Sequence, residues 1–309
     1  MSIISVEVDK LNKSYGKVKA LQDISFSVNK GELFGFIGPD GAGKTTLFRI
    51  LTTLLIPDQG FASVEQLNVV KDFKKIRRKL GYMPGKFSLY QDLTVEENLK
   101  FFASIFRTTI EENYYLIKDI YKQIEPFKNR PAGKLSGGMK QKLALSCALI
   151  HKPTVLFLDE PTTGVDAVSR KEFWEMLRML KESGITILVS TPYMDEASLC
   201  DRVALMQKGS IMSIDTPSNI IEQFALKIFA IKTEDMYQLI RDLREYPDAR
   251  SAFLFGQYIH YTDKSDKPVE TKIQKYLFEK GHKNIEIVPI KANIEDCFME
   301  LMSKNENIN

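Results

Sequence analysis

The chain has 309 residues, of which 44% are hydrophobic and 27% are charged, a composition typical of a soluble globular protein. This length allows one α/β domain and a smaller second domain. The formal net charge is only +3, so the charge balance gives no indication of a nucleic-acid surface. The three cysteines are widely spaced, so we expect reduced thiols in the cytosol. No apolar run is as long as a membrane span, and we expect no signal peptide.

The first part of the chain predicts antiparallel strands. Apolar and polar residues alternate in three short runs, over residues 6–8, 18–21 and 24–28. Residues typical of turns, among them Asn12 and Gly16, stand between these runs. Tyr15 is expected in the turn after the first strand, where its ring could stack on a purine or could pack locally.

A phosphate-binding motif follows. It fits the P-loop pattern G-x-x-x-x-G-K-[ST] and consists of Gly38, Pro39, Asp40, Gly41, Ala42, Gly43, Lys44, Thr45 and Thr46. The apolar segment Leu33–Ile37 before it predicts a buried strand, and residues 46–51 after it predict a helix. Because the motif requires a strand before it and a helix after it, its surroundings favour a nucleotide site over an ordinary glycine-rich turn.

The chemistry of this motif follows from its backbone. Glycines at positions 38, 41 and 43 can adopt positive φ and turn main-chain amides towards a phosphate. The helix that follows adds the positive end of its dipole. Lys44 would contact the β- and γ-phosphates, and the Thr45 hydroxyl would ligate Mg²⁺.

Helices are predicted in the middle of the chain. Residues 94–97 have the form of a capping box, which predicts a helix beginning there. Its apolar stripe, which we interpret as core, contains Leu99, Phe102, Ala103 and Phe106. A second glycine-containing helix start, Leu135-Ser136-Gly137-Gly138, is another possible anion site but is weak as a bare pattern.

An acidic pair ends the next buried strand. Val155–Leu158 is apolar and leads into Asp159 and Glu160. The carboxyl end of such a strand is where an α/β sheet binds ligands. Asp159 suits an Mg²⁺ ion, and Glu160 could polarise an attacking water.

These three motifs, in this order and spacing, resemble those of ABC transporter ATPase subunits. The resemblance covers about residues 3–220, and Leu-Ser-Gly-Gly is its most specific part, since this signature distinguishes the class from other P-loop proteins. Residues 163–166 are similar to the D-loop of the family, with Asp166 at its acidic position. The long tail and residues 193–197 resemble the ABC-2, multidrug-type export branch. The implied fold is α/β: a mixed sheet with a helical subdomain and an antiparallel β subdomain.

The resemblance also implies a mechanism. Two ATPase domains would close head to tail and trap MgATP between them. In this chain Gly38–Thr46 and Asp159 would form one wall, while Ser136, Gly137 and Gly138 would reach the nucleotide of the partner. Tyr15 would then stack on adenine. Closure would drive an integral membrane permease, which implies a peripheral position on the cytoplasmic, inner face of the cell membrane.

Two positions depart from the family pattern. Gly85 follows Pro84 where the family has a Gln that contacts Mg²⁺ and water, and Pro192 stands where a switch His would hold the γ-phosphate. Proline has no side-chain donor. Because fixed donors near the transferring phosphate are lost, we expect a site that binds MgATP but turns it over slowly. Glu160 is retained, so the site is not dismantled. The signature, in which Met139 replaces the usual Gln, could still complete a site on a second, intact ATPase subunit, so we prefer a heterodimer to a homodimer.

The tail predicts a separate domain. We divide the chain into an ATPase domain, residues 1–221, and a small α+β accessory domain, residues 222–309. The expected elements of the tail follow the order βαββαβ with a closing helix, which is ferredoxin-like. A regulatory role, a dimer contact and a passive stabilising appendage all remain open for it.

Other functions remain as alternatives. One is a soluble ABC-type ATPase that acts on nucleic acid or ribosomes. Such proteins usually carry paired cassettes, coiled-coil insertions or zinc sites, and this sequence shows one P-loop, no heptad run and no cysteine cluster. A second alternative is a regulatory subunit that binds ATP without hydrolysing it. We expect no nucleic-acid partner.

Overall fold

The computed structural model describes residues 3–265 and 269–306. The chain forms two compact units, Met1–Pro217 and Ser218–Asn309, and each is described here by itself.

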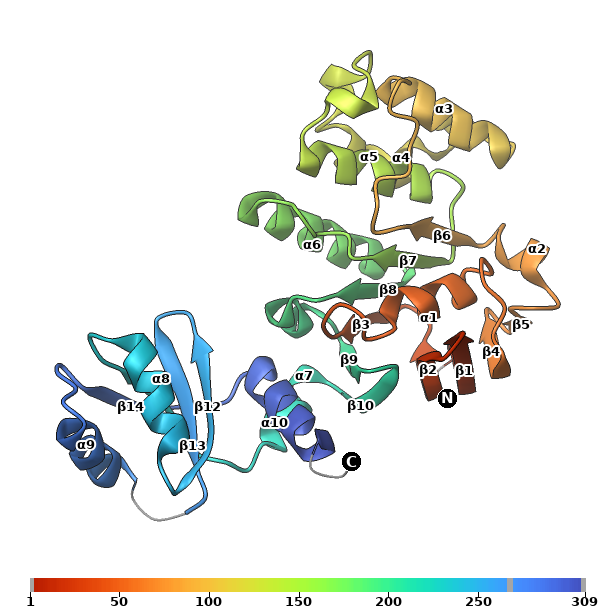
Figure 1. Ribbon diagram of the computed structural model, residues 1–309. Coiled ribbons are helices and arrows are strands. Elements are labelled where there is room, and N and C mark those ends of the chain that lie inside the picture. The colour runs from red at the N-terminus through yellow and green to blue at the C-terminus, as the bar shows by residue number, and fades with distance from the viewer. Residues whose placement is uncertain (1–2, 266–268, 307–309) are drawn as a thin grey trace. The chain divides into compact units, whose positions relative to one another are not determined.

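Two sheets and six α-helices form most of the described part of the first unit (Figure 1). The antiparallel sheet has the order β2-β1-β4-β5, with the strands β1 (Ile4–Tyr15), β2 (Val18–Asn29), β4 (Gln59–Val64) and β5 (Leu67–Asn68). The larger sheet has the order β10-β9-β3-β8-β7-β6, with the strands β3 (Leu33–Ile37), β6 (Leu80–Met83), β7 (Val155–Asp159), β8 (Thr186–Thr191), β9 (Arg202–Gln207) and β10 (Ser210–Asp215). The helices are α1 (Lys44–Leu51), α2 (Phe73–Ile76), α3 (Val95–Ile105), α4 (Ile110–Tyr121), α5 (Gly137–Leu149) and α6 (Ala167–Glu182).

The larger sheet is mixed, as the sequence predicts. Strands β6, β7, β8, β3 and β9 run parallel, and β10 is antiparallel to β9. The strands β3, β7 and β8 are buried along their whole length, as expected of a sheet covered on both faces, and the polar residues Asp159, Ser190 and Thr191 stand at the carboxyl ends of β7 and β8. Their carboxyl ends meet at one edge, where Asp159 pairs with Ser190 and Ile37 pairs with Thr191.

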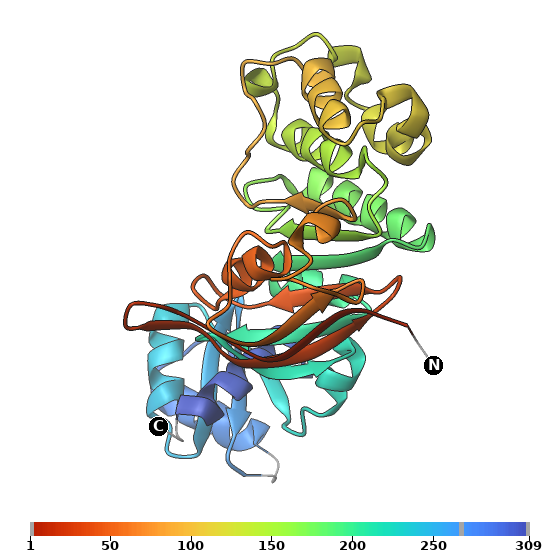
Figure 2. The ribbon, with the colours of Figure 1, turned by 90° about the vertical axis from the view of Figure 1, so that its right-hand side faces the viewer.

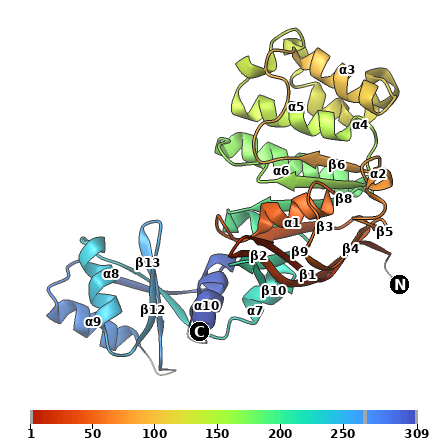
Figure 3. The same cartoon turned by 45° about the vertical axis from the view of Figure 1, so that its right-hand side comes forward.

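Five phenylalanines run through the largely aliphatic core of the first unit. Phe26, Phe34, Phe36, Phe48 and Phe157 contact one another in sequence, with ring centroids between 5.0 and 5.9 Å apart. These rings come from β2, β3, α1 and β7. They therefore hold helix α1 beside the ends of the strands, and the β1–β2 hairpin lies below α1 in Figures 2 and 3.

Helices α3, α4 and α5 form a layer beyond the β6 edge of the mixed sheet (Figure 1). The capping box predicted for α3 is present, because Thr94 and Glu97 exchange hydrogen bonds at its start. Leu99 and Ala103 are buried, as predicted for the apolar stripe. Phe102 and Phe106 instead are only half-buried and line a cavity.

The first two strands differ from the prediction. The short runs join into two strands of 12 residues each, and Asn12 lies inside β1 rather than in a turn. It marks an irregularity of the strand pairing, where Asn12 Nδ2 donates to Asp23 Oδ1 (2.8 Å) and Asp23 N donates to Asn12 Oδ1 (3.0 Å). Polar residues such as asparagine occur at irregularities of strand pairing as well as in turns. The residue type at position 12 could therefore not distinguish a bulge from a turn.

The second unit has the ferredoxin-like fold predicted for the tail. Its antiparallel sheet has the order β12-β13-β11-β14. Its strands are β11 (Ile228–Lys232), β12 (Ala249–Phe255), β13 (Tyr258–Asp263) and β14 (Glu286–Ile290). Its helices are α8 (Met236–Glu245), α9 (Glu270–Glu279) and the closing α10 (Ile294–Glu306), and α7 (Pro217–Glu222) begins at the boundary.

Candidate nucleotide-binding site

The glycine loop has the conformation that a phosphate cradle requires. Gly41 and Gly43 have φ values of 79° and 103°, and Gly43 caps helix α1. A Cβ atom at Gly43 would lie 2.5 Å from the carbonyl oxygen of Ala20 in β2, so only glycine fits there. The contact with β2 fixes the glycine loop in front of the N-terminus of α1. The N–H groups of the first turn of a helix have no partners within the helix, so this arrangement fits a phosphate group.

Lys44 lies across this loop. Its side chain is buried, and Nζ donates to Gly38 O at 2.8 Å and to Pro39 O at 3.1 Å. The same nitrogen lies 3.4 Å from Glu160 Oε1. The predicted phosphate-binding cation and the predicted water-polarising carboxylate thus meet in the structure.

The predicted magnesium ligands also meet. Thr45 Oγ1 donates to Asp159 Oδ1 over 3.2 Å, at the edge where α1 begins and β7 ends. A hydroxyl and a carboxylate oxygen are ligands that Mg²⁺ prefers. Among the described residues there is no group of three or more His, Cys, Asp and Glu side chains that could hold a metal ion.

Sequence reasoning missed Ser190. Its hydroxyl donates to Asp159 Oδ1 at 2.5 Å and accepts from the amide of Glu160 at 3.1 Å. Ser190 is the last residue but one of β8 and pairs with Asp159 in the sheet, so only the strand order, which the sequence does not give, could have indicated it. Tyr82 in β6 also lies near this carboxylate, and burial together with the charge of Asp159 raises the pKa of Tyr82 to about 12.

A cavity of about 670 Å³ joins the loop to Tyr15. Tyr15 ends β1 and is 47% exposed, and Glu160 lies on the same cavity. The rest of the lining consists of Lys17, Val18, Lys19, Ala20, Gln22, Gly41, Ala42, Gly43, Lys44, Thr45, Thr46 and Lys208. Lys17, in the short turn after Tyr15, and Lys19, at the start of β2, add positive charge that the motif search did not find.

The signature does not line this cavity. Ser136 caps helix α5, accepting a hydrogen bond from Met139 N at 3.3 Å. A Cβ atom at Gly138 would lie 2.7 Å from Ser169 Oγ, so the start of α5 packs against the start of α6. Asp166 caps α6 through a bond of 3.0 Å from Ser169 N. The signature, residues 135–138, and the D-loop segment, residues 163–166, therefore lie next to each other. Neither of them lines the cavity of the glycine loop.

The two positions that depart from the family pattern lie at the sheet edge. A Cβ atom at Gly85 would lie 3.1 Å from Asp159 O, so this residue passes close behind the acidic pair. Pro192 directly follows Thr191 at the end of β8. Among the described residues no histidine lines the nucleotide cavity: His151 lies in another cavity of the first unit, and the other two lie in the second unit.

Comparisons with known proteins agree with this site. The sequence model of the ABC transporter family matches residues 21–163. The Nod factor export ATP-binding protein I of Burkholderia thailandensis is 33% identical over 98% of this chain and 99% of its own length. The probable multidrug ABC transporter ATP-binding protein YbhF of Escherichia coli is 37% identical over 84% of this chain, and the match spans only 42% of that relative.

Solved structures show the same fold. An ATP-binding subunit of an ABC transporter has a TM-score of 0.65 and 28% identity, covering 71% of this chain and 93% of that one. The dimeric cassette MJ0796, in a post-hydrolysis state with ADP and Pi, has a TM-score of 0.62 and 26% identity, covering 68% and 98%. No helix in the described part of this chain is long and apolar enough to cross a membrane. The chain therefore belongs to the ABC transporter family and has the ATPase fold of that family.

Proposed function

We propose that this chain binds MgATP at the loop Gly38–Thr46 and energises a membrane exporter by nucleotide-driven closure. The observation that carries the proposal is the meeting of Lys44 with Glu160 and of Thr45 with Asp159 at one sheet edge. Thr45 and Asp159 would hold the Mg²⁺ ion of MgATP, which would supply positive charge against the phosphates. Lys44 would exchange its two backbone acceptors for phosphate oxygens, and Glu160 would orient the attacking water.

Closure requires a second ATPase domain. Ser136, Gly137 and Gly138 lie outside the chain's own cavity, so we assign them to the nucleotide of a partner. A solved relative, MJ0796, is dimeric, which supports this arrangement. We assign nucleotide binding to residues 1–221 and an accessory role to residues 222–309. Tyr15, on the rim of the cavity, would stack on the adenine ring.

The chain's own site is weakened for hydrolysis. Gly85 and Pro192 lie beside Asp159 and Thr191 without a side-chain donor for the transferring phosphate. Loss of one such donor typically lowers the rate by about 100- to 1,000-fold. In a heterodimer, the glycine loop of an intact second ATPase subunit and the signature of this chain would together form a competent site. In a homodimer, both sites would lack the donors that Gly85 and Pro192 replace.

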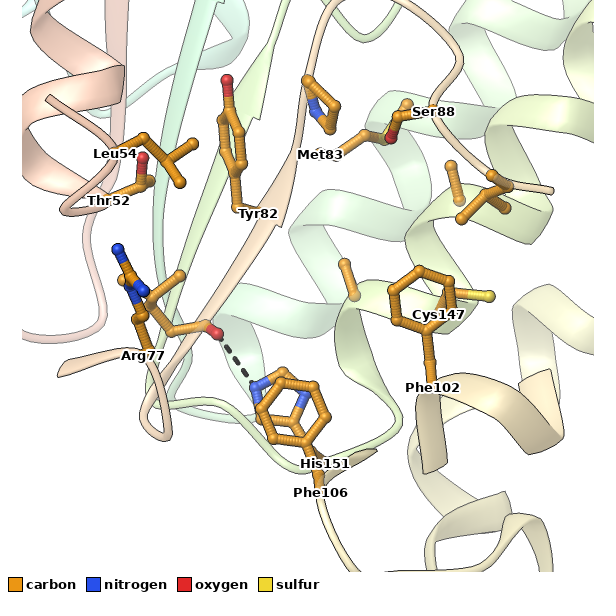
Figure 4. A pocket seen from close by; sticks show the side chains of 15 residues that line it. Thr52, Leu54, Arg77, Tyr82, Met83, Ser88, Phe102, Phe106, Cys147 and His151 are labelled. Atoms are coloured by element: carbon orange, nitrogen blue, oxygen red, sulfur yellow. Dashed lines mark hydrogen bonds between the residues drawn. The ribbon is translucent and has the colours of Figure 1, made fainter. Parts of the chain in front are cut away.

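The permease would bind the first unit at a second cavity. This cavity of about 320 Å³ lies between β6 and the helices α3 and α5 (Figure 4). Its lining is mainly apolar and includes Met83 and Pro84, directly before Gly85. A segment that occupies it therefore touches the loop that passes behind Asp159. Leu54, on its rim, is 58% exposed.

His151 indicates the chemistry of the occupant. Its Nε2 bonds Leu80 O at 2.9 Å and its ring stacks on Phe106 (Figure 4). Burial lowers the pKa of His151, which keeps the ring neutral, and a carbonyl oxygen can only accept, so Nε2 carries the proton. Nδ1 is then a buried acceptor, without a hydrogen-bond partner in the described part of the chain. A bulky apolar side chain of the permease with a nearby N–H or O–H group would fit.

Two measurements test the proposal. Steady-state ATPase of the purified chain is compared with a Gly85→Gln/Pro192→His variant, and the same pair with Lys44→Ala serves as an inactive control. Slow wild-type turnover that rises at least about tenfold in the variant supports the weakened site. Fast wild-type turnover that the two changes leave unaltered contradicts it.

Purification of the tagged chain from membranes identifies its partners. We expect a permease and a second ATPase subunit to accompany it, and recovery of the permease alone contradicts the heterodimer. Ala144→Trp would fill the second cavity and release the permease while MgATP affinity is retained. Ala225→Trp, at an exposed alanine outside this cavity, is the matched control.

A further inference from the structure

The first unit contains a buried carboxylate, in the segment 193–197, to which the proposed function assigns no role. Glu196 is only 1% exposed, in a short 3₁₀ helix, Met194–Leu199. Its oxygens accept hydrogen bonds from Thr162 Oγ1 at 2.8 Å and from Thr191 Oγ1 at 2.6 Å. The guanidinium of Arg170 lies 3.1 Å away and neutralises the charge. A buried charge with a full set of partners fixes those partners strongly, because removing it leaves them unsatisfied.

The partners come from three segments around the nucleotide site. Thr162 is two residues beyond Glu160, and Thr191 follows Ser190, which holds Asp159. Arg170 lies in the first turns of α6, and its backbone amide donates to the carbonyl oxygen of Asp166 at 2.9 Å. One carboxylate thus ties the segment after β7, the end of β8 and the start of α6 together.

The residue that needs this support is Glu160. Its φ of 50° lies in the left-handed region, which is strained for a residue with a side chain. On one side its amide donates to Ser190 O at 2.9 Å. On the other side the chain is held by Thr162, through its bond to Glu196. The left-handed backbone brings the carboxylate of Glu160 to Lys44, and a relaxed backbone would aim it elsewhere.

Residues 191–193, which contain Pro192, are fixed by Glu196 and Arg170 as well. Tyr193 N donates to Thr191 Oγ1 at 3.0 Å, and the guanidinium of Arg170 lies 4.3 Å from the centre of the Tyr193 ring. Pro192 is held between these two anchored residues. The segment therefore has a fixed path even though its proline offers no side chain to the phosphate.

We infer that Glu196 is a positioning residue, which holds Glu160 in its strained conformation and so sets the rate of hydrolysis without contacting the nucleotide. This inference rests on the proposed function, because it concerns the hydrolysis step of that same site. The loop Gly38–Thr46 is held by other contacts, through Lys44 and the Gly43–Ala20 approach. Loss of the Glu196 carboxylate therefore lowers the rate of hydrolysis and leaves MgATP affinity nearly unchanged.

Single-turnover hydrolysis with protein in excess measures even a slow rate, and MgATP affinity is measured on the same samples. Glu196→Gln and Thr162→Val are expected to lower the single-turnover rate at least about tenfold, with the Kd for MgATP changed less than about threefold. Glu32→Gln is the matched control: Glu32 is also buried and pairs with an arginine, Arg202, at 3.2 Å, but lies at the opposite end of β3 from the glycine loop. It should change neither quantity.

The outcomes separate the two ideas. A wild-type rate in Glu196→Gln overturns the positioning role, as does an equal loss of rate and affinity. A wild-type chain that binds MgATP but hydrolyses none in a single turnover also overturns it. Absence of MgATP binding by the wild type instead contradicts the proposed function. If Glu196→Gln does not fold, Arg170→Met/Glu196→Gln removes both charges together and takes its place in the same comparison.

Discussion

Thr45 Oγ1 and Asp159 Oδ1 lie 3.2 Å apart although 114 residues separate them in the chain. Thr45 lies in the first turn of helix α1 and Asp159 ends strand β7, and the aromatic contact between Phe48 and Phe157 holds these two elements together. The distance between two hard oxygen ligands is thus set by the core and does not depend on a flexible loop. A bound Mg²⁺ ion would meet a preformed pair of ligands.

Asp159→Asn should make ATP binding almost independent of magnesium. The amide keeps the size of the side chain but loses the charge that Mg²⁺ prefers, so we expect the Kd for MgATP to rise at least about tenfold. The Kd for ATP in EDTA should stay the same. Calorimetric titrations with and without Mg²⁺ measure both, and Asp201→Asn, which removes the charge that pairs with Lys181, is the control. An unchanged response to magnesium in Asp159→Asn would place the metal elsewhere.

Tyr15→Ala should weaken nucleotide binding, and Tyr15→Phe should not. Stacking of an aromatic ring on a base contributes about 1–3 kcal/mol, so the loss corresponds to roughly a fivefold or larger rise in Kd. Every base has a π-face, so ATP and GTP should be affected alike. Tyr90→Ala is a suitable control, since Tyr90 is similarly exposed, at 51%, and does not line the cavity. Equal affinities of the Ala and Phe variants would show that the ring does not stack.

The sequence predicted the parts of this site that depend on local geometry. The glycine loop and the acidic strand end each consist of a few consecutive residues, 38–46 and 155–160, and the sequence next to each of them predicts a strand or a helix. Ser190 and Glu196 could not be found this way, because their partners Asp159 and Thr162 come from other strands and loops. Pairing between strands distant in sequence is a property of the fold, and a single sequence carries little local signal for it.

Gly138→Ala should destabilise the first unit, and Ser169→Gly should suppress the effect. The new Cβ atom would lie 2.7 Å from Ser169 Oγ and 3.0 Å from its Cβ, so α5 and α6 must move apart at an expected cost of about 1–3 kcal/mol. At Gly137 the nearest contact of a Cβ would be 3.4 Å, to Gly164 O, so Gly137→Ala is a matched control with a smaller effect. Urea unfolding of the single and double variants gives the coupling free energy. Additive effects of Gly138→Ala and Ser169→Gly would contradict the contact.

His151 should make the stability of the first unit depend on pH. Burial lowers the pKa of His151 in the folded chain below the unfolded value of 6.5. The unfolded state therefore binds the proton more readily, so this contribution to stability is fully present above pH 6.5 and is lost as the pH falls towards the lowered pKa of the folded state. Within that window the free energy of unfolding should fall by up to about 1.4 kcal/mol per pH unit.

Trp174, the single tryptophan of the chain, lies in the first unit, so its fluorescence reports the unfolding of that unit. Titration of the two histidines of the second unit does not enter this measurement directly. His151→Gln keeps a donor for Leu80 O but cannot titrate, so its unfolding free energy should change less between pH 7.5 and 5.5 than that of the wild type. The stacking contact with Phe106 is lost in this variant at every pH, so only the slope is compared and not the absolute stability. Parallel slopes for the two proteins would mean that the ring accepts a proton as readily in the folded chain as in the unfolded one, and that the cavity of Figure 4 presents a cation to its partner in mild acid.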